Sequence, residues 1–120
     1  MAKVVDLENG QIREYPESTA QRTLIPVKGM RGFEGIDYVR GLRQDGQPSL
    51  DGKASYTLDF QKKDLADQLV ETLETHLGDN LAVRLDGAEN VYKLAFPKKH
   101  LHDVLLWCKS LVIQKNRTGR

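Results

Sequence analysis

The second half of this 120-residue chain repeats itself at an offset of 36 positions. Eight residues recur in the same order, and they span an alternating segment, two lysines and the start of a leucine-rich segment. Leu50-Asp51-Gly52 also recurs as Leu85-Asp86-Gly87, one residue out of step. Because self-similarity at a fixed spacing is typical of a duplicated structural unit, we predict a unit of strand, Asp-Gly turn, strand, Lys-Lys and helix. The eight matched pairs are Tyr56 and Tyr92, Leu58 and Leu94, Phe60 and Phe96, Lys62 and Lys98, Lys63 and Lys99, Leu65 and Leu101, Asp67 and Asp103, and Leu69 and Leu105.

Hydrophobic patterning supports each element of this unit. Leucines recur every four residues over 64–77, which predicts an amphipathic helix, and Gly78 follows where a left-handed cap belongs. A second helix is predicted to open at Pro97 and to run to about Gln114. Alternation of apolar and polar residues predicts half-buried strands over 54–60, 81–85 and 91–96.

The first 50 residues are less regular. Two alternating segments, 3–7 and 11–15, flank Asn9-Gly10, a strong signal for a hairpin turn. Residues 23–27 read as extended, and Pro26 confines them to a sheet edge or a non-strand path. Residues 36–42 are ambiguous between a short helix and a strand. We predict an extension over 1–32, a duplicated domain over 33–115 and a flexible basic tail over 116–120.

These elements predict an α+β fold. Since one ββα unit cannot bury its sheet face and its helix well, two units are expected to share a four-stranded antiparallel sheet with both helices on one face. The result is a two-layer sandwich, and the N-terminal hairpin is expected to extend its sheet or to cover an edge.

Composition narrows the class of protein. The formal net charge is +1 and 39% of residues are hydrophobic, which is ordinary for a globular domain. The longest apolar run covers residues 104–107, far too short to span a membrane. A single cysteine, Cys108, excludes an intramolecular disulfide, and no secretory signal opens the sequence. We therefore expect a cytoplasmic domain without membrane contact, and we expect Cys108 to be a core thiol.

Positive charge gathers toward the C-terminus. Residues 51–94 carry a net −4 and residues 95–120 a net +5. Both Lys-Lys pairs precede a predicted helix, although helix N-termini favour acidic side chains, so the lysines and the free backbone N–H groups suggest two phosphate sites. The alternative is that these lysines are ordinary solvent-exposed residues at the turns from strand to helix and bind nothing. The candidate nucleic-acid-binding residues are Lys62, Lys63, Arg84, Lys93, Lys98, Lys99, His100, Lys115 and Arg117.

The open face of the predicted sheet is small and mixed in character, with Ser55, Thr57 and Asp59 on one strand. The aromatic residues of these strands share the core-facing register, which disfavours base stacking; they are Tyr56, Phe60, Tyr92 and Phe96. Of the two nucleic acids, we expect DNA rather than RNA as the partner. Leu106 and Trp107 lie off the core stripe of the last helix. They are expected to pack beneath the N-terminal hairpin or to form a self-association patch.

Residues 33–46, FEGIDYVRGLRQDG, resemble the motif segment of the LAGLIDADG homing endonucleases. Tyr38-Val39-Arg40-Gly41-Leu42 matches the beginning of the motif and Asp45-Gly46 its end, and residues 33–117 are similar to one half of such an enzyme. The resemblance implies that residues 33–46 include a helix through which two chains dimerise. It also implies that the sheet lies in the DNA major groove and that Asp45 binds a divalent metal such as Mg²⁺.

Three hypotheses follow. The first is a small non-enzymatic domain that binds nucleic acid, or regulates through it, by gripping phosphates at the two lysine corners. The second is a module for protein–protein interaction or homodimer formation through Leu106 and Trp107. The third is a metal-dependent DNA endonuclease that uses Asp45. The first two require no cofactor, and the histidines and the cysteine show no metal-ligand spacing.

Overall fold

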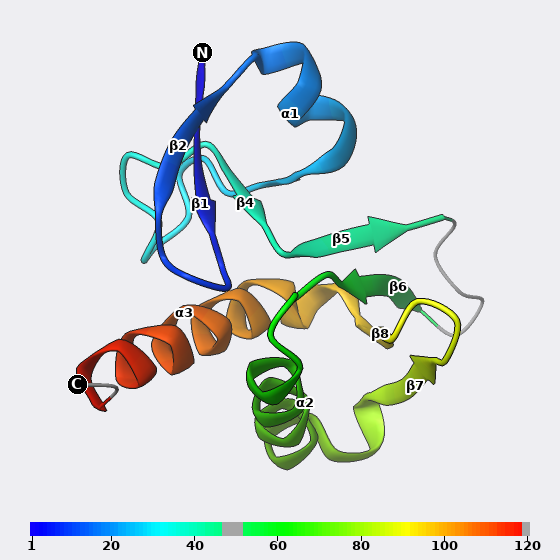
Figure 1. Ribbon diagram of the computed structural model, residues 1–120. Helices are drawn as coiled ribbons and strands as arrows, with labels where there is room; N and C mark the ends of the chain where they lie inside the picture. The colour runs from blue at the N-terminus through cyan, green and yellow to red at the C-terminus, as the bar shows by residue number, and fades with distance from the viewer. Residues whose placement is uncertain (47–51, 119–120) are drawn as a thin grey trace.

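Two four-stranded sheets and three α-helices form the described part of the chain (Figure 1). The computed structural model describes residues 1–46 and 52–118, and it describes side chains as far as Gln114. The strands are β1 (Ala2–Asp6), β2 (Ile12–Tyr15), β3 (Ile25–Pro26), β4 (Tyr38–Arg40), β5 (Leu42–Asp45), β6 (Lys53–Leu58), β7 (Ala82–Asp86) and β8 (Val91–Pro97). The α-helices are α1 (Glu17–Thr23), α2 (Lys63–Leu77) and α3 (Leu101–Thr118), and the 3₁₀ turns are η1 (Gly78–Asn80) and η2 (Lys98–His100).

The first sheet has the strand order β2-β1-β4-β3. Its β1–β2 pair confirms the predicted hairpin, and Gly10 adopts a φ of +76° in the connecting loop. Pro26 lies in the edge strand β3, where a missing N–H does least damage, as expected. The ambiguous segment 36–42 is extended, because β4 pairs in parallel with β1. The hairpin therefore belongs to a sheet of its own.

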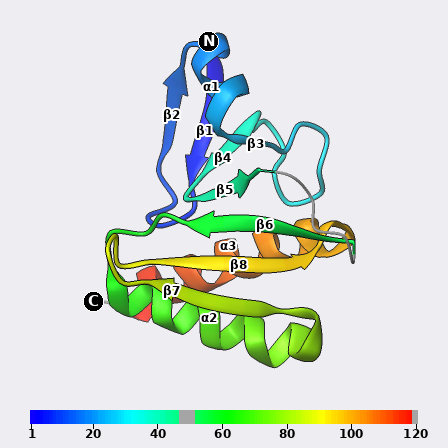
Figure 2. The ribbon, with the colours of Figure 1, turned by 90° about the vertical axis from the view of Figure 1, so that its right-hand side faces the viewer.

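The second sheet has the order β5-β6-β8-β7, and all its neighbouring strands are antiparallel. Its chain order is ββα twice, with β5, β6 and α2 followed by β7, β8 and α3. Figure 2 shows the sheet in front and both helices behind it. The predicted α+β sandwich with two helices on one face is thus confirmed.

The strand register relates residues that are 36 positions apart. Thr57 lies directly opposite Lys93, while Tyr56 pairs with Leu94 and Leu58 with Tyr92. Exchanging each residue for its counterpart 36 positions away leaves this set of pairs unchanged. A local twofold axis therefore passes between Thr57 and Lys93.

One predicted equivalence between the two ββα units is wrong, namely that of their Asp-Gly turns. Arg43 pairs with Thr57, and Arg84 pairs with Lys93, so Arg43 and Arg84 are equivalent positions. By the same rule Asp45-Gly46 corresponds to Asp86-Gly87, whereas our prediction matched Leu50-Asp51-Gly52, of which Leu50 and Asp51 lie outside the described residues. The offset is 41 here, because the connection after β5 is longer than the hairpin turn after β7.

Both sheets contribute to one main hydrophobic core. Leu7, directly after β1, and Val39 of β4 pack into the same cluster as Leu58, Leu94 and the inner faces of α2 and α3. The structural transition between the sheets is Gly41, between β4 and β5, rather than residue 33. Helix α3 continues to Thr118, so residues 115–118 are helical, whereas our prediction placed the end of the helix near Gln114 and a flexible tail over 116–120.

Candidate nucleic-acid interface

Each Lys-Lys pair lies at a corner, where the chain turns from a strand into a helix: Lys62-Lys63 at the corner before α2 and Lys98-Lys99 at the corner before α3. The two corners lie at opposite ends of the second sheet. Each corner follows the C-terminal end of its strand, and the two strands, β6 and β8, are antiparallel neighbours. Leu58 at the end of β6 pairs with Tyr92, whereas Pro97 at the end of β8 pairs with Lys53. Five residue steps of about 3.3 Å separate these ends by roughly 17 Å. The two corners therefore do not form one phosphate site.

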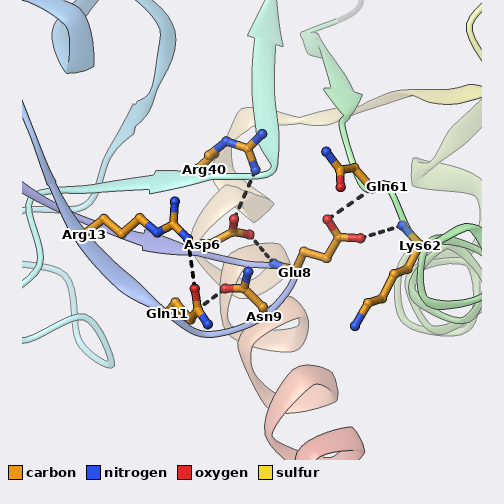
Figure 3. Close-up of polar contacts among 8 residues, drawn as sticks. All are labelled: Asp6, Glu8, Asn9, Gln11, Arg13, Arg40, Gln61 and Lys62. Atoms are coloured by element: carbon orange, nitrogen blue, oxygen red, sulfur yellow. Dashed lines mark hydrogen bonds and ion pairs between the residues drawn. The ribbon is translucent and has the colours of Figure 1, made fainter.

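The corner before α2 already holds a carboxylate of the chain itself. Glu8, in the loop between β1 and β2, accepts hydrogen bonds from the backbone N–H groups of Gln61 at 3.1 Å and Lys62 at 2.6 Å (Figure 3). A carboxylate is favoured here by the free N–H groups and the partial positive charge at a helix N-terminus. An external phosphate would have to displace Glu8 to reach these donors.

A short polar chain holds Glu8 in this position. Asp6 Oδ1 accepts a hydrogen bond from the backbone N–H of Glu8 at 2.8 Å, and Asp6 Oδ2 accepts one from Arg40 at 3.0 Å (Figure 3). Asn9 Oδ1 accepts a hydrogen bond from the backbone N–H of Gln11, which shapes the same loop. Glu8 and Asp6 were not among the predicted functional residues. Since 53 positions separate Glu8 from Gln61, no local sequence pattern announces this contact.

The side chains of the first lysine pair differ from each other. Lys63 forms an ion pair with Asp67 and donates a hydrogen bond to the Tyr92 hydroxyl at 3.3 Å. The hydrogen bond from Lys63 and a second from Tyr92 lower the pKa of Asp67, and Asp67 in turn raises the pKa of Lys63. Lys62 is exposed, and Figure 3 shows its ammonium pointing away from Glu8. Of these two lysines, Lys62 is therefore the one whose ammonium has no partner among the described residues.

The corner before α3 is different. Lys98 and Lys99 are both exposed in η2, and within the described ranges neither ammonium forms an ion pair or a hydrogen bond. His100 completes this turn and is half-buried. Asp103 is the acidic residue of the first turn of α3, and it does not pair with either lysine. This corner retains its positive charge.

A loop from the first half of the chain adds to the second corner. The Nε2–H of His102 donates a hydrogen bond to the carbonyl oxygen of Arg31 at 2.8 Å, and Lys109 donates one to the carbonyl oxygen of Gly32. The loop that carries the exposed Arg31 therefore lies against the first half of α3. Arg31 was missed from the sequence, because its place beside α3 depends on contacts across 71 positions.

The open face of the second sheet carries a mixed polar network. Arg43 forms an ion pair with Asp59, which raises the pKa of Arg43. Thr57 donates a hydrogen bond to Asp45, and Lys93 donates one to Thr57 at 3.0 Å and lies 3.7 Å from Asp45. Acidic and basic groups are balanced at the centre of this face.

Beside this network, small side chains leave a shallow hollow of about 430 Å³. Ser55, Ala82 and Ala95 line it from three neighbouring strands, and the charged residues Asp45, Arg84 and Lys93 line it as well. Arg84 is exposed and is unpaired within residues 1–46 and 52–114, although it lies directly opposite Lys93. Like charges in that position are unfavourable. Since Lys93 already engages Asp45 and Thr57, Arg84 is the candidate for contact with an anion on this face.

The segment that resembles the LAGLIDADG motif does not form a helix. Tyr38–Arg40 and Leu42–Asp45 are the strands β4 and β5, so these residues do not form the helix that the resemblance implies within 33–46. A strand forms here because β4 pairs with β1 and β5 pairs with β6. Asp45 contacts Thr57, Arg43 and Lys93. Among the residues with described side chains, no three His, Cys, Asp or Glu groups are placed to share a metal ion.

Leu106 and Trp107 both pack within the chain. Each is half-buried against the main core. Leu106 lies beneath the glycine loop, where a Cβ on Gly32 would come within 2.5 Å of it, and Trp107 stacks on His76 with ring centroids 4.3 Å apart. These contacts are with the glycine loop and with α2 rather than with the N-terminal hairpin, beneath which we predicted that the two side chains pack. The other alternative, a self-association patch, stays a prediction. Lys115 and Arg117 lie in α3, but their side chains are outside the described residues.

None of the helices in the described part of the chain combines the length and the apolar character of a membrane span. Comparison with protein-family models, with curated proteins and with solved structures finds no match to this chain.

Proposed function

We propose that this chain is a nucleic-acid-binding domain that contacts the phosphate backbone through the corner before α3. The observation that carries this proposal is the difference between the two corners. Glu8 occupies the N-terminus of α2, whereas Lys98 and Lys99 have no carboxylate partner among the described residues. Three cationic side chains would make the contacts: Arg31, Lys98 and Lys99.

The two ββα units are, in this proposal, copies of one unit that have diverged in function. The 36-residue sequence match and the symmetric register of β6 and β8 support this view. One copy retains an open cationic corner, and the other uses the equivalent corner to attach the N-terminal sheet through Glu8. A basic corner without internal compensation is less expected for stability alone, because lysines repel the positive end of a helix.

Duplex DNA fits the geometry best. Proteins that bind single strands use exposed aromatic rings for base stacking. Tyr56 and Phe96 instead stack on each other within the core, with ring centroids 4.3 Å apart. Contacts to the backbone of a duplex require no such rings.

The 36-residue offset provides a matched pair of variants. Lys98→Glu and Lys62→Glu change the same charge at equivalent positions, and both side chains are exposed. We expect Lys98→Glu to weaken binding to a mixed-sequence duplex by about tenfold, as for the loss of one strong charged contact. Lys62→Glu should change the affinity by less than about threefold. The readout is fluorescence anisotropy at about 50 mM salt, where electrostatic binding is strong.

Two results would contradict the proposal. One is the absence of any duplex binding by the unmodified chain at this salt concentration. The other is an equal loss of affinity in Lys98→Glu and Lys62→Glu, which would mean that only the net charge matters. Circular dichroism spectra of both variants check that each remains folded.

A further inference from the structure

Strand β7 is an open edge of the second sheet and carries exposed apolar side chains. Val83 and Leu85 are 36% and 45% exposed, although both belong to the face of the sheet that carries the helices. The opposite edge strand, β5, follows β4 directly and lies against β3 of the first sheet. An unprotected edge strand with apolar side chains is a template for pairing with another strand.

We propose that two copies of this chain pair antiparallel through β7. The inference goes beyond the proposed function and does not depend on nucleic acid. A twofold axis perpendicular to the sheet keeps the helix layers of both copies on the same side. Side chains of directly opposed residues then point to the same face, so the residue at the axis lies opposite the same residue of the other copy. For the exposed centre of β7, the possible positions are Val83, Arg84 and Leu85.

Charge selects one of these three registers. With the axis at Arg84, two arginines would lie directly opposite each other, which is unfavourable. With the axis at Val83, Arg84 would face Ala82 of the second copy. With the axis at Leu85, Arg84 of each copy faces Asp86 of the other, which gives two ion pairs and brings the two exposed Leu85 side chains together.

The outcome is an eight-stranded sheet with four helices on one face. Figure 2 shows β7 at the edge of the sheet that is farthest from the N-terminal sheet, so that sheet does not obstruct the approach. Helix α2 borders the same edge. The open faces of both copies would then form one continuous surface.

Cysteine substitution tests both the interface and its register. Cys108 is fully buried, so an added thiol at the edge is the reactive one. In the proposed register the Cα atoms of the two copies at position 85 are about 5.5 Å apart, within the range that a disulfide spans. We expect Leu85→Cys to form a disulfide-linked dimer under mild oxidation. Val83→Cys should not, because in this register it lies opposite Gly87 of the other copy.

A second pair of variants tests the interaction without a covalent bond. Leu85 and Gln44 occupy equivalent positions, opposite Tyr92 and Tyr56 respectively, but Gln44 lies in β5 at the other edge. Leu85→Lys places two like charges at the twofold axis, so sedimentation should change from dimer to monomer at about 100 µM protein. Gln44→Lys should sediment like the unmodified chain.

Four results would overturn this proposal. They are a monomeric unmodified chain at the same concentration, a dimer that persists in Leu85→Lys, the loss of the dimer in Gln44→Lys, or cross-linking of Val83→Cys in preference to Leu85→Cys. All of these measurements are made without nucleic acid, so they fail or succeed independently of the proposed function.

Discussion

Glu8 joins the two sheets through the end of a helix. Its carboxylate lies in the first sheet's hairpin loop and accepts two backbone N–H groups at the start of α2. We expect Glu8→Ala to lower the free energy of unfolding by about 1 kcal/mol, the usual effect of removing a side-chain cap. Urea denaturation followed by circular dichroism measures this change.

Glu14→Ala is the matched control for Glu8, because Glu14 is an exposed glutamate of the same hairpin and, among the residues that the structure describes, makes no hydrogen bond or ion pair with α2. Its free energy of unfolding should stay within about 0.5 kcal/mol of the unmodified chain, as for most surface substitutions. Equal losses in Glu8→Ala and Glu14→Ala would show that the contacts with Gln61 and Lys62 contribute nothing specific.

The hydroxyl of Tyr56 is buried and has no hydrogen-bond partner among the described residues. Burial raises the pKa of this hydroxyl, and its ring stacks on Phe96. Tyr56→Phe keeps the ring and removes the unsatisfied group, so we expect it to raise the free energy of unfolding by about 1 kcal/mol. A loss of stability in the same urea experiment would mean that the hydroxyl has a partner, such as a bound water.

Burial raises the pKa of the Cys108 thiol to about 12. Since the thiolate is the reactive form, iodoacetamide should not label the native chain at pH 8 and should label it fully in denaturant. The unfolded chain releases this proton near pH 8.5, so the thiol also makes the native state less stable as the pH rises above that value. Rapid labelling of the native chain at pH 8, followed by mass spectrometry, would contradict the buried position.

At the scale of elements, Gly41 decides how β4 passes into β5. Its φ of +116° is unfavourable for any other residue, and a Cβ there would lie 2.9 Å from the Phe60 ring and 3.3 Å from Leu7. We expect Gly41→Ala to lower the free energy of unfolding by about 3 kcal/mol, from backbone strain and overpacking together.

Gly46→Ala is the control for Gly41. Gly46 also has a positive φ, of +54°, but nothing lies within 4 Å of the added Cβ. The strain alone should cost about 1 kcal/mol. If the free energy of unfolding falls equally in both variants, the close packing of Gly41 against Phe60 does not contribute to stability.

The elements that could be predicted are those with a local pattern. The leucine stripe of α2, the cap at Gly78 and the alternation in β6 and β8 depend on near neighbours in the sequence, and all appear in the structure. Helix α1 could not be predicted, because it has seven residues and buries only Ala20. Strand β4 was ambiguous, because its identity depends on pairing with β1, more than 30 residues away.

The candidate site was predictable only in part, for the same reason. The sequence places Lys98 and Lys99 before a helix, and that position is correct. It also places Lys62 and Lys63 there, but it cannot reveal that Glu8 reaches across 54 positions to the backbone of Lys62. Likewise, nothing in the local sequence around Arg31 indicates that its loop lies against α3.

At the scale of the whole molecule, the net charge of +1 does not show how unevenly positive and negative side chains are distributed over the surface. The open sheet face is balanced internally, since Arg43, Asp45, Asp59 and Lys93 engage one another. The corner before α3 is not balanced. A polyanion should therefore be held at one end of the second sheet, with few charged contacts across its centre.

The salt dependence of duplex binding tests this account most directly. Three phosphate contacts predict a slope of about −2.7 in a plot of log affinity against log salt concentration, at about 0.9 per contact. Replacing Lys98 and Lys99 by glutamine should reduce the magnitude of the slope by about 1.8 while the chain remains folded. A slope that is unchanged in this double variant, or one close to zero in the unmodified chain, would contradict phosphate binding at the corner before α3.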